Sequence, residues 1–139
     1  MITFLLFFLL SSVKSSSQLI VVEISTQTLF YFEDGVLIKK IPVSTARDGY
    51  VTPKGKFQIV EKFPVVFSKR RNNRKLIYWL GFTKNGYYGI HALPNDDYEK
   101  NLGKKNSTGC VRVSREDGKW LFKRVKRGTL LIITEKRDR

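Results

Sequence analysis

The sequence predicts a mainly β fold of the α+β class, a β-sandwich or barrel with one helix in the C-terminal region. Three observations support this fold. Short runs rich in β-branched and aromatic residues recur along the chain, Gly, Asn and Pro residues separate them, and one capped helical pattern follows residue 114. A length of 139 residues, 42% of them hydrophobic, suits a single domain with one core.

The N-terminal third predicts a buried strand followed by a β-hairpin. Residues 18–24 are nearly all apolar or β-branched, which is typical of a strand buried on both faces. Residues 29–32 and 36–41 are two further strand patterns on either side of Asp34-Gly35. This dipeptide favours the positive φ angles of a tight hairpin turn.

The middle of the chain alternates predicted loops and strands. Residues 44–55 contain Gly and Pro and are predicted to form a loop, after which residues 56–62 have an alternating strand pattern. Two more strands are predicted at 76–82 and 87–91. The basic stretch 64–75 lies between these patterns, and its polarity predicts an exposed flap.

The last third predicts the single helix. Residues 100–109 are polar and rich in turn residues, which indicates a loop. Ser114 followed by acidic residues is an N-cap pattern, and it predicts a helix over 115–127 that ends at Gly128. Residues 129–134 predict a closing strand.

Residues 1–17 predict a signal peptide, with 18–139 as the mature domain. The run MITFLLFFLL is followed by small residues of the kind that signal peptidases accept. It is too short to cross roughly 30 Å of hydrocarbon, and no later segment predicts an integral membrane span. No Lys or Arg precedes the run, so a core strand or an uncleaved anchor is an alternative. We expect export to the periplasm or cell wall.

The chain is strongly basic, with 26 Lys and Arg, 12 Asp and Glu, and a net charge of +14. Such a field attracts polyanions, so nucleic acid, anionic lipid and an anionic cell wall are all candidate partners. Export argues against nucleic acid, and we predict no specific nucleic-acid partner and no particular oligomeric state. The densest clusters, in 69–75 and 123–127, are equally typical of an ordinary solvated surface.

Cys110 and His91 are the one cysteine and the one histidine of the chain. A single thiol in an exported protein is buried, paired between chains or chemically employed. Gly109 lets the backbone before the thiol approach a substrate, so that consecutive amides can point at one oxygen. A structural cysteine and histidine would give the same pattern. One His and one Cys fall short of a zinc set, so no metal or cofactor is expected.

A wider pattern of motifs favours a catalytic role for this cysteine and histidine over a structural one. It comprises Ser44-Thr45, then Thr52-Pro53-Lys54-Gly55-Lys56-Phe57, then Gly89-Ile90-His91, then Ser107-Thr108-Gly109-Cys110-Val111-Arg112, and finally the capped helix. In order and approximate spacing, this pattern resembles the L,D-transpeptidase catalytic domain family (YkuD-like). The resemblance covers about Leu19 to Ile133.

The resemblance implies a role for each matching residue. Cys110 would be the nucleophile and His91 its base, with the second ring nitrogen held by the backbone carbonyl of Ala92. Backbone amides of the Ser107-Thr108-Gly109 loop and of the nucleophile would form the oxyanion hole. Arg112 would bind a substrate carboxylate or serve a structural role.

Four aromatic residues of the predicted strands before His91 could stack on the substrate in the cleft, or simply belong to the core: Tyr78, Trp79, Tyr87 and Tyr88. Thr108 departs from the family pattern, because many members have His immediately before Gly-Cys.

The resemblance implies an enzyme that cross-links peptidoglycan tetrapeptide stems through a Cys110 thioester. An L,D-carboxypeptidase using the same acyl-enzyme and a non-catalytic, basic cell-wall-binding module are the alternatives.

Overall fold

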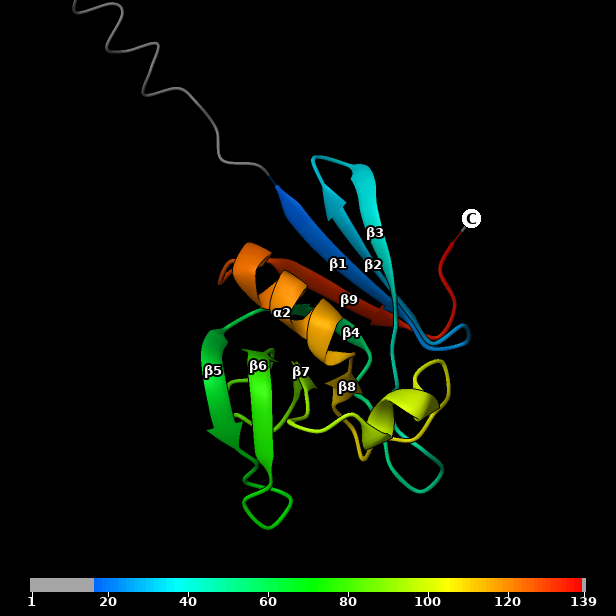
Figure 1. Cartoon of the computed structure of the whole chain (residues 1–139). Coiled ribbons are helices and arrows are strands. Elements are labelled where there is room, and N and C mark those ends of the chain that lie inside the picture. The colour runs from blue at the N-terminus through cyan, green and yellow to red at the C-terminus, as the bar shows by residue number, and fades with distance from the viewer. Residues whose placement is uncertain (1–16, 139) are drawn as a thin grey trace, which may run out of the picture.

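The computed structural model describes residues 17–138, so the predicted signal peptide, apart from its last residue, lies outside the described residues. The described chain forms a five-stranded sheet of order β3-β2-β1-β9-β4 and a four-stranded sheet of order β5-β6-β7-β8 (Figure 1). The elements are β1 (Gln18–Glu23), β2 (Thr28–Glu33), β3 (Val36–Pro42), β4 (Gly55–Gln58), β5 (Glu61–Phe67), β6 (Lys75–Gly81), β7 (Gly89–Ala92), the 3₁₀ helix η1 (Asp97–Asn101), β8 (Val111–Arg112), α2 (Arg115–Arg124) and β9 (Leu130–Thr134).

The predicted fold class, mainly β with one α-helix in the C-terminal region, is confirmed. The hairpin turn is also as predicted, since Asp34 and Gly35 both have positive φ angles, of 49° and 80°. Strand β1 pairs with β2 in antiparallel and with β9 in parallel orientation, which explains its apolar sequence. Within residues 17–138, no helix has the length and hydropathy that a membrane crossing requires.

One predicted strand is in fact two. The segment 56–62 divides into β4, in the first sheet, and β5, in the second. The amide of Ile59 donates to the carbonyl of Thr129, next to the first sheet, while the amide of Val60 donates to Gly81 of the second. The alternating pattern therefore continues through a crossing between sheets. Because β5 extends to Phe67, the exposed loop is shorter than predicted and covers residues 68–74, which we call the arginine flap.

The helix begins as predicted and ends earlier. The Ser114 hydroxyl accepts a hydrogen bond from the amide of Asp117 at 3.0 Å, the expected N-cap. The helix ends at Arg124, three residues before the predicted end, because Val125 turns into extended backbone and is fully buried. The next amide, of Lys126, donates to the side chain of Gln18 instead of continuing the helix.

Helix α2 lies across the junction of the two sheets and packs on both (Figure 1). Its Trp120 ring meets Tyr31 of the first sheet edge-on at 5.3 Å, and Phe122 lies 5.9 Å from Tyr78 of the second. A Cβ on Gly118 would lie 3.1 Å from the Cβ of Ala92. The absence of a side chain at this glycine lets the helix lie directly against β7, the strand that carries His91.

Candidate active site

The segment that leads to Cys110, residues 106–110, is here called the nucleophile loop. It is fastened by backbone hydrogen bonds to residues 44–47. The Ser107 amide donates to the carbonyl of Thr45 at 2.9 Å, and the Arg47 amide donates to the carbonyl of Ser107 at 2.9 Å. Ser107 is fully buried. The loop is therefore fixed on both sides before the chain reaches the thiol.

Side chains complete the support of this loop. The Ser107 hydroxyl donates to the carbonyl of Cys110 at 2.6 Å and accepts the amide of Gly109 at 3.1 Å. The Thr52 hydroxyl donates to the carbonyl of Gly109 at 2.8 Å. Gly109 has a φ angle of 137°, and a Cβ there would lie 2.7 Å from the ring of Tyr88. A residue with a side chain is therefore excluded immediately before the cysteine.

His91 is held in one tautomer by its own strand. Its Nδ1 lies 2.9 Å from the carbonyl oxygen of Ala92, and because a carbonyl only accepts, Nδ1 carries the hydrogen. Nε2 of the neutral ring then has a lone pair and can accept a proton. The imidazole is 3% exposed and stacks on Trp79, with ring centroids 5.9 Å apart. Burial, together with the positive charges of Arg112 and Arg74, lowers the pKa of His91 to about 4, although the hydrogen bond to Ala92 acts in the opposite direction.

Cys110 is half-buried, and its thiol donates a weak hydrogen bond to the carbonyl of Tyr87, with sulfur and oxygen 3.6 Å apart. Burial raises the pKa of the thiol, while the charges of Arg70 and Arg112 act in the opposite direction. At neutral pH the empty site therefore holds a thiol and a neutral imidazole, with two guanidinium groups placed to stabilise a thiolate.

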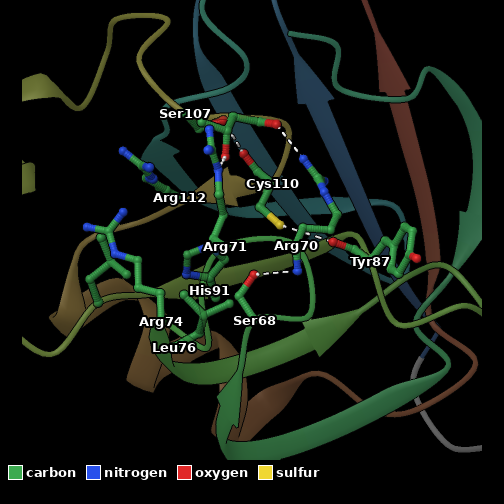
Figure 2. Close-up of a pocket in the computed structure, with 12 residues that line it drawn as sticks. Ser68, Arg70, Arg71, Arg74, Leu76, Tyr87, His91, Ser107, Cys110 and Arg112 are labelled. Carbon is green, nitrogen blue, oxygen red and sulfur yellow. Dashed lines mark hydrogen bonds between the residues drawn. The ribbon is translucent and has the colours of Figure 1, made fainter.

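Cys110 and His91 line one small cavity of about 30 Å³ (Figure 2). A space of this size accommodates a water molecule and no peptide. The remaining lining residues come from the arginine flap, from β6 and β8, and from the segments around the thiol: Ser68, Arg70, Arg71, Arg74, Leu76, Tyr87, Leu93, Ser107, Thr108 and Arg112.

The arginine flap contacts the nucleophile loop through two side chains. Arg70 donates through Nη2 to the carbonyl of Thr108 at 2.6 Å, and its guanidinium lies 4.4 Å from the ring centroid of Tyr88. Arg71 donates through Nε to the hydroxyl of Thr108 at 3.1 Å. The other terminal nitrogen of Arg70, Nη1, is buried and has no hydrogen-bond partner among the described residues. The flap therefore covers part of the cavity, and one of its buried donors has no partner among the described residues.

Comparison with known proteins identifies this arrangement. The family model of the L,D-transpeptidase catalytic domain (YkuD) matches residues 17–133. The chain belongs to this family. The YkuD protein of Bacillus licheniformis is 32% identical over 115 residues, which are 83% of this chain and 64% of that protein. An L,D-transpeptidase structure from Stackebrandtia nassauensis superposes with a TM-score of 0.74 at 28% identity, covering 90% of this chain and 58% of that one.

A second L,D-transpeptidase structure, from Mycobacterium tuberculosis H37Rv, gives a TM-score of 0.78 at 26% identity, over 87% of this chain and 59% of that one. This chain therefore spans less than two thirds of the length of these relatives. Within the L,D-transpeptidase domain that it forms, the structure brings together Cys110, His91, Ala92, the nucleophile loop and Arg112. Arg112 is 9% exposed and donates weakly to the carbonyl of Asn106.

Two of the predicted substrate aromatics of this L,D-transpeptidase domain, Tyr78 and Trp79, lie away from the cavity. A bulge in β6 gives Tyr78 a φ angle of 56°, and its ring lies against Phe122 of α2. Trp79 is buried behind His91, where its Nε1 donates to Glu61 at 3.2 Å. Neither of these two rings lines the cavity of Cys110, so their contact with a substrate stays a prediction.

Sequence reasoning missed three arginines that line the cavity, Arg70, Arg71 and Arg74. Their clustering was visible in the sequence, but nothing in the sequence indicated that the flap folds over the nucleophile loop. Tyr87 was expected in the cleft wall and does line the cavity, but the hydrogen bond that its backbone carbonyl accepts from the thiol was missed, because every residue has such a carbonyl. Thr52 belongs to a motif that the family resemblance did mark, and its hydroxyl explains why a threonine stands there.

Proposed function

We propose that this protein is an exported cysteine acyltransferase that cross-links peptidoglycan tetrapeptide stems through a thioester on Cys110. One observation carries the proposal. Cys110 and His91 meet at one cavity, and the Ala92 carbonyl holds the imidazole in the tautomer that can accept the thiol proton. Membership of the L,D-transpeptidase family supplies the substrate class.

In the first half-reaction, the proton of the Cys110 thiol moves to Nε2 of His91. The thiolate then attacks the carbonyl carbon of the third stem residue, in the amide bond that joins it to the fourth. The tetrahedral intermediate collapses with cleavage of the carbon–nitrogen bond, and His91 returns the proton to the amine of the departing D-amino acid. A thioester remains on Cys110. The charges of Arg70 and Arg112 favour the thiolate, which offsets part of the burial that raises the thiol pKa.

The oxyanion of this intermediate needs donors that are already in place. The Gly109 amide is occupied by the Ser107 hydroxyl, so we assign the oxyanion to the amides of Thr108 and Cys110. The unpaired Nη1 of Arg70 is a further donor on the flap side. Thr108 would then serve through its backbone, which is consistent with a threonine in place of the common histidine.

In the second half-reaction, an amine of a neighbouring stem attacks the thioester carbonyl and gives its proton to His91. The new amide bond forms as the thiolate leaves, and His91 returns the proton to sulfur. Resolution by water in place of the amine would give an L,D-carboxypeptidase. Both reactions require the arginine flap to move, because the cavity of about 30 Å³ is too small for either peptide.

The test is mass spectrometry of purified disaccharide-tetrapeptide after incubation with the protein. The proposal predicts cross-linked dimers and a transient thioester on Cys110, with neither product from Cys110→Ala. Tripeptide without dimers would identify the carboxypeptidase. No product from correctly folded protein would support the non-catalytic wall-binding module. A carbapenem gives a second readout, since ring opening by the thiolate should add one drug mass on Cys110.

A further inference from the structure

Beside the thiol cavity lies a second, larger hollow of about 310 Å³, here called the anion hollow. It is lined by Arg47, Arg71, Asn72, Arg74, Thr108 and Arg112. Four of these six residues are arginines and the other two are neutral, so the lining contains no carboxylate. Within residues 17–138, none of the four arginines takes part in an ion pair with an Asp or Glu.

Three of the four guanidinium groups are fixed in place by uncharged partners. Arg47 and Arg71 both lie over the ring of Tyr50, at 4.9 and 5.1 Å from its centroid. Arg71 is also bonded to the hydroxyl of Thr108, and Arg112 to the carbonyl of Asn106. Ordered guanidinium groups bind planar anions with less loss of side-chain entropy than free ones.

This concentration of like charge is unfavourable in the empty protein. The pKa of Arg112 is lowered first by burial and then by the charges of Arg74, Arg47 and Arg71. Four neighbouring cations with no acidic counterpart leave a net positive site, whose repulsion a bound anion would relieve. A surface that served only solubility would not need one of its cations to be 9% exposed.

The anion hollow shares a wall with the reaction centre. Arg71, Arg74, Thr108 and Arg112 line both the hollow and the cavity of Cys110. A ligand in the hollow would therefore lie next to the peptide bond under attack. Because each guanidinium can pair with one carboxylate through two parallel hydrogen bonds, the hollow has donors for at least two carboxylates.

We propose that the anion hollow is a binding subsite for a peptide segment that carries two or more carboxylates and engages Cys110 at the same time. This inference rests on the proposed function. It adds that the arginine flap recognises acidic side chains of the substrate. Free phosphate has related chemistry. We favour the peptide because the hollow opens beside the thiol and spans several arginines.

The test compares two probes by isothermal titration calorimetry on the full chain, N-acetyl-Glu-Glu amide and N-acetyl-Gln-Gln amide. The acidic peptide should bind at least about 10-fold more tightly. Arg47→Gln and Arg74→Gln should each weaken its binding about 10-fold, because each removes a bidentate partner. Lys75→Gln is the matched control, since it removes one charge next to the flap from an exposed residue outside the hollow, and it should change binding less than 2-fold.

Three outcomes would overturn the proposal: equal binding of the two peptides, equal effects of Arg74→Gln and Lys75→Gln, or tighter binding of inorganic phosphate than of the acidic peptide. Turnover provides an independent check, in which Arg74→Gln should raise KM more for a stem with free carboxylates than for its amidated form. Binding without any turnover would contradict the proposed function alone. Turnover without selective binding would contradict this inference alone.

Discussion

The nucleophile loop and the arginine flap both lie next to the Cys110 thiol. The rest of the protein holds the loop through its backbone, whereas the flap contacts the loop through side chains. The loop is fastened by backbone hydrogen bonds to residues 44–47, and two side chains, Ser107 within the loop and Thr52 outside it, form further bonds to its backbone. The flap has one backbone hydrogen bond between its ends, from Ser68 to Arg74, and one from Arg74 to Arg71. It contacts the loop through long, partly exposed arginines.

This difference separates two tasks. Atoms that react must be placed accurately, so the loop and His91 are built on the sheets. A cover over the thiol must open to admit a peptide, and long side chains can release their contacts without breaking a strand. The comparison therefore predicts that changes in the loop side affect chemistry, while changes in the flap, apart from Arg70 with its contact to the loop, affect binding and access. The predictions below test that division.

The largest effect on turnover is expected when the Cys110 thiol is removed. Cys110→Ala should reduce turnover of stem peptide by at least about 10⁴-fold, because the covalent route is lost. The melting temperature should change little, since the side chain is small and half-buried. His91→Ala should cost a similar factor, and the double variant should be no slower than either single one. Additive losses would show that the two residues do not act as a unit.

The next effect is a loss of folding stability at acidic pH, which follows from the burial of His91. Its pKa of about 4 in the folded state lies below the ordinary 6.5, so the unfolded state binds more protons between these values. Stability is therefore complete above pH 6.5 and decreases as the pH falls towards 4, by about 3 kcal/mol from this residue.

The measurement is direct because His91 is the one histidine in the chain. An NMR titration of its imidazole in the folded protein should give a midpoint far below 6.5. His91→Gln should remove this share of the acid sensitivity, whereas Cys110→Ala should retain it. A midpoint at or above 6.5 would mean that the loop side of the site is open to solvent.

A smaller effect is expected at the contact between flap and loop. Arg70→Ala removes the bond to the Thr108 carbonyl and a charge that lowers the thiol pKa. We expect kcat to fall about 10-fold to 100-fold, the range for a charge-assisted hydrogen bond. The pH dependence of Cys110 alkylation should shift upward. Lys69→Ala removes a neighbouring charge without this contact and is the control; a shift of equal size there would exclude a specific role for Arg70.

Local chemistry was sufficient to predict much of the fold from the sequence. The turn at Asp34-Gly35 and the cap at Ser114 were predictable because each depends on its own few residues. The crossing at Ile59 and the early helix end at Val125 were not. At both points the local pattern continues unchanged, and the interruption comes from burial against segments distant in sequence.

The same distinction applies to the candidate site. Cys110 and His91 were recognisable because their residue types and motifs carry chemistry. The contact of Arg70 and Arg71 with Thr108 was not, because 37 or more positions separate the partners and nothing local marks the pair. The anion hollow likewise depends on how Arg47, Arg74 and Arg112 converge from three segments, which only the fold determines.

The smallest effect on chemistry is expected from the basic surface far from the thiol, which we propose holds the protein on an anionic cell wall. Lys123, Lys126 and Arg127 are exposed and lie outside the linings of both the thiol cavity and the anion hollow. Charges of this kind act at long range, and salt screens them beyond about 10 Å at 0.1 M and about 3 Å at 1 M.

Binding to insoluble peptidoglycan should therefore weaken steeply with salt, and Lys126→Gln/Arg127→Gln should weaken it at low salt. Turnover of a small soluble stem peptide should keep its kcat over the same range, because these surface charges lie outside the lining of the thiol cavity. A modest rise in KM is expected where substrate carboxylates pair with arginines at short range, which salt screens less. The comparison is a sacculus pull-down against soluble-peptide kinetics. If wall binding were insensitive to salt, contacts other than charge would hold the protein there, and the division between a rigid reaction centre and an electrostatic periphery would fail.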